Sequence, residues 1–356
     1  MKLLKGNEIL RATLAQEMER DGRVLLLGED IASLGGIFRV TAGLADRFGK
    51  DRVMDMPISE SGFVGMGVGA AMMGMRPVVE IVFSDVLPVC MDQIVNTAAK
   101  TRFVTNGLLH VPMVIRTPTI SNVTVYQSQS FEAWFAHVPG LKVVMPSKPE
   151  DAGGLLLTAI RDPDPVIFIE NRFIYEMTAW VSDKIQPIAF GKARVCRRGT
   201  DVTVVTWGAN MVAMAEEVAE QVSQDGVSVE VIDPRTLVPF DRAAVVKSVS
   251  KTGRLVVLHE AVRRCGFGAE IVATVADSEA FARLKAPMVR VANPGVPVAF
   301  SRALQKYALP DSADLTAAIF RVMGRAKPLA KARDGKVKPK RKPVKLGSPS
   351  GYARTH

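Results

Sequence analysis

Two kinds of hydrophobic pattern alternate along the first half of the chain. Residues 7–20 place apolar side chains at every third or fourth position, the spacing of one helical face. Asn7 stands just ahead of this pattern, so it is the expected N-cap. Residues 24–28 follow as a short continuous apolar run, which is typical of a parallel strand buried on both faces.

The same alternation continues to about residue 170. Residues 62–74 are rich in Gly, Ala, Val and Met, which predicts a helix packed closely against its neighbours because glycine otherwise weakens a helix. Further strands are expected at 78–83, 113–116, 143–145 and 166–170, and helices at 92–101 and 150–160. Strands that alternate with helices indicate a parallel, doubly wound sheet.

The pattern breaks at residues 171–190, where we expect a linker. A second alternating series follows, with strands expected at 202–207, 227–232, 255–259 and 288–291 and helices at 210–223 and 267–281. The predicted fold class is therefore α/β, with two doubly wound domains at residues 1–185 and 186–324. Residues 325–356 alternate Lys with Pro and carry few apolar groups, so we expect a disordered basic tail.

Length and composition agree with two soluble domains. The 356 residues suit two domains, and a hydrophobic share of 48% can build sizeable cores. No apolar run approaches the roughly 18 residues of a membrane span, and the first residues lack a secretory signal. The odd number of cysteines (Cys90, Cys196, Cys265) and their lack of zinc spacing indicate reduced thiols and a cytoplasmic protein.

The net charge of +10 belongs to the tail. Residues 325–356 hold eleven of the 46 basic side chains and one of the 36 acidic ones, which leaves 35 of each sign elsewhere. Nucleic-acid binding by the folded part is therefore not expected. Two interpretations of the tail stay open: a solvated extension, or a segment that docks an acidic partner such as a core protein or RNA.

Candidate chemistry follows from the rule that doubly wound sheets bind ligands beyond the carboxyl ends of their strands. The rule selects Glu29, Phe83, Asp85 and the loop after Arg116. Glu60, just before the Gly-rich helix, is a further candidate, although a carboxylate there also suits the helix dipole. The sequence has no P-loop, no GxSxG motif and no metal spacing among its four histidines, so residue patterns alone predict an enzyme of unspecified chemistry.

Seven segments resemble one known family. They are LLLGEDI (25–31), GGIFRVTAGLADRFG (35–49), DMPISESGFVGMGVGAAMMGMRPVVEIVFSD (55–85), SQSFEAWFAHVPGLKVVMPS (128–147), IRDPDPVIFIENR (160–172), VIDPRTLVPFD (231–241) and HEAVRRCGFGAEI (259–271). The chain thereby resembles the beta subunits of the thiamine-diphosphate-dependent pyruvate, branched-chain 2-oxo acid and acetoin dehydrogenases. The resemblance implies a transketolase-like pyrimidine-binding domain followed by a transketolase C-terminal-like domain.

The resemblance also implies an activity and partners. The family decarboxylates a small 2-oxo acid oxidatively and transfers the acyl group to lipoamide on a dihydrolipoyl acyltransferase core. Its members are heterotetramers of two alpha and two beta subunits, with thiamine diphosphate between the two kinds of subunit. The alpha subunit holds Mg²⁺ and the diphosphate through a GDG motif, which this sequence lacks.

Individual site residues are carried over from the resemblance. Glu60 corresponds to the carboxyl that hydrogen-bonds N1′ of the aminopyrimidine and helps the cofactor lose its C2 proton, so it is the expected catalytic residue. Glu29 is expected in the same network, and Ile58 and Phe83 are expected to pack on the ring. The family's structural potassium ion implies main-chain carbonyl ligands, which match Met113, Ala159, Ile160, Asp162 and Asp164.

One catalytic position departs from the family. Gln127 stands where the family has a histidine that handles the substrate and the acyl group. An amide cannot act as a general acid near neutral pH. Three hypotheses follow: a dehydrogenase subunit with altered substrate preference, a thiamine-dependent decarboxylase or carboligase subunit that does not use lipoamide, and a non-catalytic assembly partner.

Overall fold

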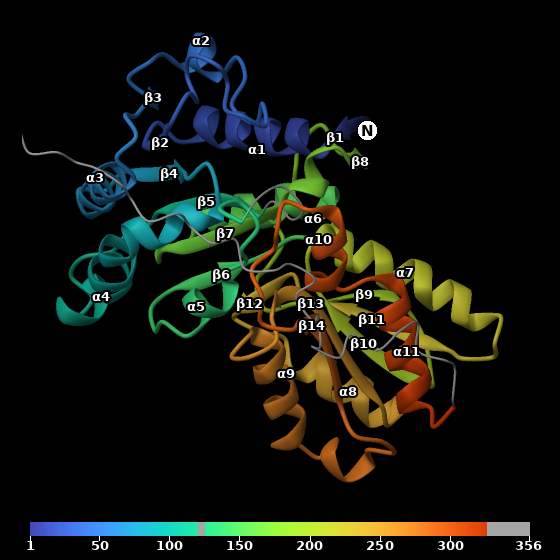
Figure 1. Cartoon of the computed structure of the whole chain (residues 1–356). Helices are drawn as coiled ribbons and strands as arrows, with labels where there is room; N and C mark the ends of the chain where they lie inside the picture. Colours follow the sequence, from blue (N-terminus) through green and yellow to red (C-terminus); the bar gives the residue numbers. More distant parts are fainter. Residues whose placement is uncertain (120–124, 326–356) are drawn as a thin grey trace, which may run out of the picture.

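The computed structural model describes residues 1–119 and 125–325, and these residues form two parallel sheets with helices on both faces (Figure 1). The predicted basic tail beyond residue 325 lies outside the described residues. None of the helices in the described ranges combines the length and apolar character that a membrane crossing requires. The predicted α/β class with two doubly wound units is confirmed, with an antiparallel strand at one edge of each large sheet.

Seven strands form the first sheet, and the six from the first half of the chain run parallel. In spatial order the strands are β12 (Thr236–Val238), β6 (Lys142–Val144), β7 (Val166–Asn171), β5 (Val114–Thr119), β4 (Arg76–Glu80), β2 (Val24–Gly28) and β3 (Val53–Asp55). The central strands β5 and β7 are buried along their whole length, including their polar and charged residues.

Helices cover both faces of this sheet. In chain order they are α1 (Gly6–Arg20), α2 (Leu44–Phe48), α3 (Glu60–Met72), the short 3₁₀ segment η1 (Ser84–Cys90), the π-helical η2 (Asp92–Ala98), α4 (Ala99–Val104), α5 (Glu132–Ala136) and α6 (Pro149–Arg161). Helices α1 and α6 share one apolar cluster, whereas α3 and η2 share the other. The predicted close packing of the Gly-rich helix is confirmed, because a Cβ added to Gly67 would lie 2.9 Å from Cγ2 of Val79.

A second sheet of five strands follows. In spatial order it contains β14 (Val289–Asn293), β13 (Leu255–Val262), β10 (Val202–Thr206), β11 (Val229–Asp233) and the antiparallel β9 (Arg194–Arg197). Its helices are α7 (Ala209–Ser223), α8 (Arg242–Thr252), α9 (Phe267–Ala276), the 3₁₀ turn η4 (Phe281–Arg283), α10 (Arg302–Ala308) and α11 (Ser312–Val322). Helices α7 and α11 pack on one face and contribute to a single apolar cluster with the strands.

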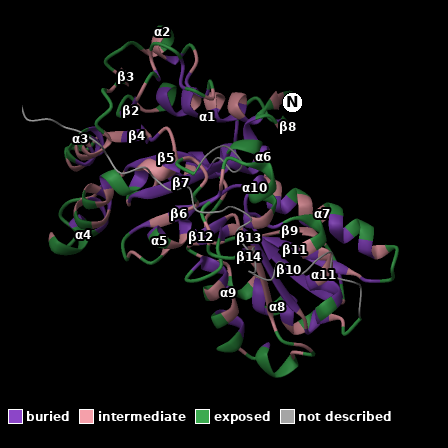
Figure 2. Cartoon of the chain, in the orientation of Figure 1, coloured by how far each residue is buried: buried purple, intermediate pink, exposed green. Residues whose placement is uncertain are grey.

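The two halves pack directly against each other. One buried cluster contains Ile94 and Phe131 from the first half together with Trp207 and Phe267 from the second. Buried residues run through the strands of both sheets, and exposed residues concentrate on the outer helix surfaces (Figure 2). The end of β10 is therefore covered by protein, because Trp207 directly after it is buried in this cluster.

Several predicted boundaries were wrong. The N-cap of α1 is Lys5, not Asn7, because the Lys5 amide donates to the Glu8 carboxylate at 2.8 Å and the Asn7 side chain turns away to donate to the Phe38 carbonyl. Strand β4 ends at Glu80 instead of residue 83, and the helix expected over 267–281 ends at residue 276. Local periodicity does not fix such ends, because contacts from distant segments decide them.

The expected linker at 171–190 contains structure of its own. It holds the 3₁₀ turn η3 (Arg172–Tyr175) and strand β8 (Thr178–Val181), which pairs antiparallel with the N-terminal strand β1 (Lys2–Lys5). Strand β12, from the second half of the sequence, pairs with β6 at the edge of the first sheet. The domain division at residue 185 therefore remains a prediction, and one strand crosses it.

Candidate active site

The order of strands opens one crevice in the first sheet. From β2 the chain moves outward to β3 and then returns across β2 to reach β4 on its other side. Connections on either side of such a reversal leave a gap beyond the carboxyl ends of the two inner strands, which is where ligands bind in open α/β sheets. Glu29 follows β2 directly, and Phe83 lies three residues beyond β4.

Glu29 and Glu60 lie together at this crevice. Glu60 is the first residue of α3, and its carboxyl is close enough to share a hydrogen bond with Glu29. Burial raises the pKa of Glu29, and the nearby charge of Glu60 raises it further. Oε1 of Glu29 is buried without a hydrogen-bond partner in the described residues. A buried, unpaired carboxyl oxygen indicates a place where a ligand supplies the missing partner.

The apolar residues that were expected here flank the carboxyl pair. Ile58, two residues before α3, is 85% exposed, which is unusual for a large aliphatic side chain unless a ligand or partner covers it. Phe83 is partly buried at the end of the β4 segment. Cys90 is buried near Glu60. Burial, and to a lesser degree the charge of Glu60, raises the pKa of Cys90 to about 12, so it stays a neutral thiol.

The loop that carries Gln127 is tied to the same edge of the sheet. The Gln129 side-chain amide donates to Oδ1 of Asp85 at 2.9 Å, and the Gln129 backbone amide donates to Oδ2 at 3.2 Å. The Ser84 hydroxyl donates to the Gln129 carbonyl at 2.6 Å. Asp85 thus holds the loop, and its partly buried carboxyl has a raised pKa because of burial. Sequence reasoning found Asp85 but missed Gln129.

The carbonyls proposed for potassium lie near one another, around the turn after α6. The Met113 carbonyl accepts from Val166, and the carbonyls of Ile160 and Asp162 accept from Nη1 of Arg76 at 2.7 and 3.2 Å. Each carbonyl oxygen has a second lone pair, and the positive group that contacts the carbonyls of Ile160 and Asp162 in the structure is the Arg76 guanidinium. The described residues contain no cluster of three or more His, Cys, Asp or Glu side chains suited to a metal.

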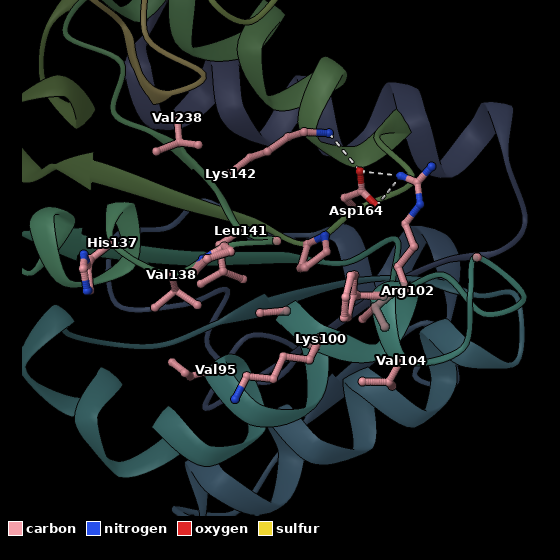
Figure 3. A pocket seen from close by; sticks show the side chains of 18 of the residues that line it. Val95, Lys100, Arg102, Val104, His137, Val138, Leu141, Lys142, Asp164 and Val238 are labelled. Atoms are coloured by element: carbon pink, nitrogen blue, oxygen red, sulfur yellow. Dashed lines mark hydrogen bonds and ion pairs between the residues drawn. The ribbon is translucent and has the colours of Figure 1, made fainter. Parts of the chain in front are cut away.

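A large apolar groove lies away from the carboxyl pair. It has a volume of about 1340 Å³ and is lined by α4, η2 and residues 137–142, 164–165 and 238–239; we call it the α4 groove (Figure 3). At its rim Asp164 accepts from Arg102 and Lys142. Phe103 on its wall is 88% exposed. An exposed apolar surface of this size indicates a protein-binding surface.

Sequence reasoning also missed a buried charge cluster below the crevice. Glu80, Arg116 and Glu170 lie on three neighbouring strands, and Arg116 pairs with both glutamates. The sequence did indicate this cluster, because each of the three residues is a charged residue in a predicted strand that is otherwise apolar. Because buried charges are normally paired, the sequence could have predicted that these three side chains contact one another.

Comparisons with known proteins agree with this geometry. The transketolase pyrimidine-binding domain matches residues 4–177, and the transketolase C-terminal domain matches residues 191–315. The chain is 42% identical over 335 residues to the pyruvate dehydrogenase E1 component subunit beta-1 of Oryza sativa subsp. japonica, covering 92% of this chain and 89% of that protein. It is 43% identical over 317 residues to the corresponding subunit of Rickettsia bellii, covering 88% and 97%.

A solved structure supports the fold alone. The chain matches a "split gene transketolase, inactive beta4 tetramer" with a TM-score of 0.74 and 20% sequence identity, covering 91% of this chain and 99% of that one. Both family models follow the chain in the order of the two sheets. The chain therefore belongs to the transketolase-like family of thiamine-diphosphate-related enzymes, as a beta subunit of the 2-oxo acid dehydrogenase type.

Proposed function

We propose that this chain supplies the aminopyrimidine half of a thiamine diphosphate site in a pyruvate-dehydrogenase-like enzyme. The observation that carries the proposal is the Glu29–Glu60 pair, with its unpartnered buried oxygen, at the reversal of strand order. A protonated carboxyl and a nitrogen base are complementary hydrogen-bonding groups. Ile58 and Phe83 would flank the ring, so the residues present fit the cofactor.

When bound, thiamine diphosphate accepts the electron pair that is released as CO₂ leaves a 2-oxo acid. The residues of this chain handle a proton at the ring nitrogen N1′. Glu60 would exchange that proton, and Glu29, whose pKa is raised by burial and by Glu60, would lie beside it. With the cofactor bound, Ile58 and Phe83 would cover the carboxyl pair and exclude water from it, which would strengthen the hydrogen bonds there.

The proposal includes an alpha subunit, because half of the site is missing from this sequence. We assign to it the GDG motif, the Mg²⁺ and the diphosphate. Two alpha and two beta chains would form a heterotetramer that takes a small 2-oxo acid, with pyruvate first to test, and passes its acyl group to a dihydrolipoyl acyltransferase core. The α4 groove and exposed Ile58 are surfaces that such a partner would cover. The proposed compartment is the cytoplasm.

Affinity purification of the chain from its own cells tests this assembly. We expect a GDG-containing alpha subunit and a lipoyl acyltransferase to accompany it, identified by mass spectrometry. Recovery of the alpha subunit alone would favour the enzyme without lipoamide. Recovery of neither would contradict the proposed function.

Gln127 is the observation that favours the second candidate, a decarboxylase or carboligase subunit that does not use lipoamide. Its loop is tied to Asp85 through Gln129, which supports a position for Gln127 beside the crevice. Gln127→His tests which enzyme this is. If the missing histidine limits acyl transfer, the variant should raise reductive acylation of a lipoyl domain, and an unchanged rate would favour the carboligase.

We also propose a potassium ion at the carbonyls of Met113, Ala159, Ile160, Asp162 and Asp164. Carbonyl oxygens are suitable ligands for a hard cation. The measurement is the melting temperature in KCl against NaCl at equal ionic strength. Higher stability in KCl supports the site, whereas equal stability removes it from the proposal.

A further inference from the structure

The buried cluster below the crevice joins three neighbouring strands. Nε and Nη2 of Arg116, on β5, donate to the two carboxylate oxygens of Glu170, on β7, at 2.8 and 2.7 Å. Nη1 donates to Oε2 of Glu80, the last residue of β4, at 2.7 Å. The Tyr175 hydroxyl donates to Glu170 at 2.6 Å. We call these four residues the Arg116 cluster.

The cluster has two acidic groups and one guanidinium group in a nearly dry environment. The side chains of Arg116, Glu80 and Glu170 are 2%, 12% and 0% exposed. An unbalanced buried charge is costly. Burial raises the pKa of Glu80, Arg116 opposes that rise, and the charge of Glu170 adds to it.

Glu80 also touches the segment that begins with Glu29. A Cβ added to Gly28 would lie 2.9 Å from the Glu80 carbonyl oxygen, so the backbones of β2 and β4 meet here without room for a side chain. A Cβ added to Gly36 would lie 2.9 Å from Oε1 of Glu80. The carboxyl of Glu80 therefore rests on residues 29–43, which we call the Gly36 loop.

Gly36 is linked to Glu29 through Asp30. The Gly36 amide donates to the Asp30 carbonyl at 3.0 Å, and Asp30 is the neighbour of Glu29. Both Gly36 and Asp30 have positive φ, 72° and 55°, so the loop is folded tightly at these positions. On its other side the loop is held by Asp55, which accepts from the amides of Ala32 and Ser33.

We infer that Glu80, oriented by Arg116, is a positioning residue that holds the Gly36 loop and so fixes Glu29 against Glu60. Arg116 secures Glu80 from β5, and its carbonyl accepts from Ile81 at 2.9 Å, so the same residue also fixes the start of the segment that leads to Phe83. The consequence for catalysis rests on the proposed function, whereas the positioning of the loop does not.

Glu80→Ala and Glu80→Gln separate positioning from bulk stability. The alanine variant removes the contact with Gly36 but leaves Arg116 and Glu170 as a matched pair, so the fold should persist. The glutamine variant keeps the size of the Glu80 side chain and an oxygen that can accept from Arg116, so it should rescue the loop. Glu80→Asp, which withdraws the carboxyl by one methylene, replaces the alanine variant if that one does not fold. The control is Arg161→Lys, because Arg161 makes a comparable pair with buried Glu17 between α1 and α6, far from the crevice.

Hydrogen exchange measured by mass spectrometry on the full-length chain gives the first readout. We expect exchange in the Gly36 loop to be about tenfold faster or more in Glu80→Ala and within about twofold of the wild type in Glu80→Gln. Arg161→Lys should speed exchange in α1 and α6 and leave the loop unchanged. Unchanged loop exchange in Glu80→Ala, or equal acceleration in Glu80→Gln, overturns the inference.

Cofactor kinetics in the assembled enzyme give the second readout. The concentration of thiamine diphosphate for half-maximal activity should rise about tenfold in Glu80→Ala and return in Glu80→Gln, with a smaller effect on kcat. An enzyme that shows the exchange effect but no use of thiamine diphosphate would refute the proposed function and leave the positioning role standing. A cofactor effect that Glu80→Gln does not rescue contradicts the inference.

Discussion

Replacement of Glu60 by glutamine should separate catalysis from stability at one position. The substitution keeps the size of the side chain at the start of α3, so α3 should form as before. It removes the carboxyl that would exchange a proton with N1′ of the cofactor. A positioned acid or base contributes about 10²–10⁴-fold to a rate, which corresponds to roughly 2.7–5.5 kcal/mol of barrier.

The Glu60→Gln variant should lose activity but gain folding stability. In the wild type Glu60 lies beside Glu29, whose Oε1 is buried without a partner in the described residues. The amide of a glutamine at position 60 can donate to that oxygen, and the like-charge repulsion disappears. Hydrogen bonds to charged groups contribute about 1.5–3 kcal/mol, which we reduce to about 1 kcal/mol because both residues are partly exposed.

The gain in stability should depend on pH with a definite sign. The folded state raises the pKa of Glu29 above its ordinary value, so the wild type loses stability as pH rises through the folded-state pKa. The difference between variant and wild type should therefore be present at pH 7 and shrink in acid, where Glu29 is protonated in both folded and unfolded chains.

Two assays test this prediction. Exchange of the cofactor C2 proton for deuterium, followed by NMR in the assembled enzyme, should slow by about 10²–10⁴-fold. Thermal unfolding should show a rise of about 2–4 °C for each kcal/mol gained in a domain of this size. Glu270→Gln is the matched control, since Glu270 is an exposed glutamate in the first turn of α9. Wild-type exchange in Glu60→Gln, or a marked loss of stability, would refute the reasoning.

Three further predictions concern the second sheet. Gly268→Ala should cost about 1–3 kcal/mol in chemical denaturation, because the new Cβ would lie 2.7 Å from Nε2 of His259, a buried ring stacked on Trp207, and an unchanged midpoint would contradict this packing. Burial raises the pKa of Asp233 to about 7, so the wild type should lose stability relative to Asp233→Asn as pH rises from 5 to 8, and parallel profiles would disprove it. Burial lowers the pKa of His259 to about 4, so the unfolding free energy should fall as pH drops from 6.5 towards 4. The same decline in a His259→Leu variant would show that His259 is not its cause.

The sequence determined the elements whose residues interact with near neighbours in the chain. Apolar runs identified β2 and β7 within one residue of their observed ends, because most positions of a strand buried on both faces are apolar. The helix over residues 7–20 followed from its spacing for the same kind of reason. The predicted edge of the sheet also placed Glu29 next to the crevice.

The tertiary structure decided which distant residues meet. Glu29 and Glu60 are joined only because α3 and the end of β2 face the same crevice, and Arg116 meets Glu80 and Glu170 only because β5 lies between β4 and β7. The pairing of β12 with β6 was equally hidden, since its partner lies in the other half of the chain. Local periodicity records which face of an element is buried, but strand order sets which charges share a buried site.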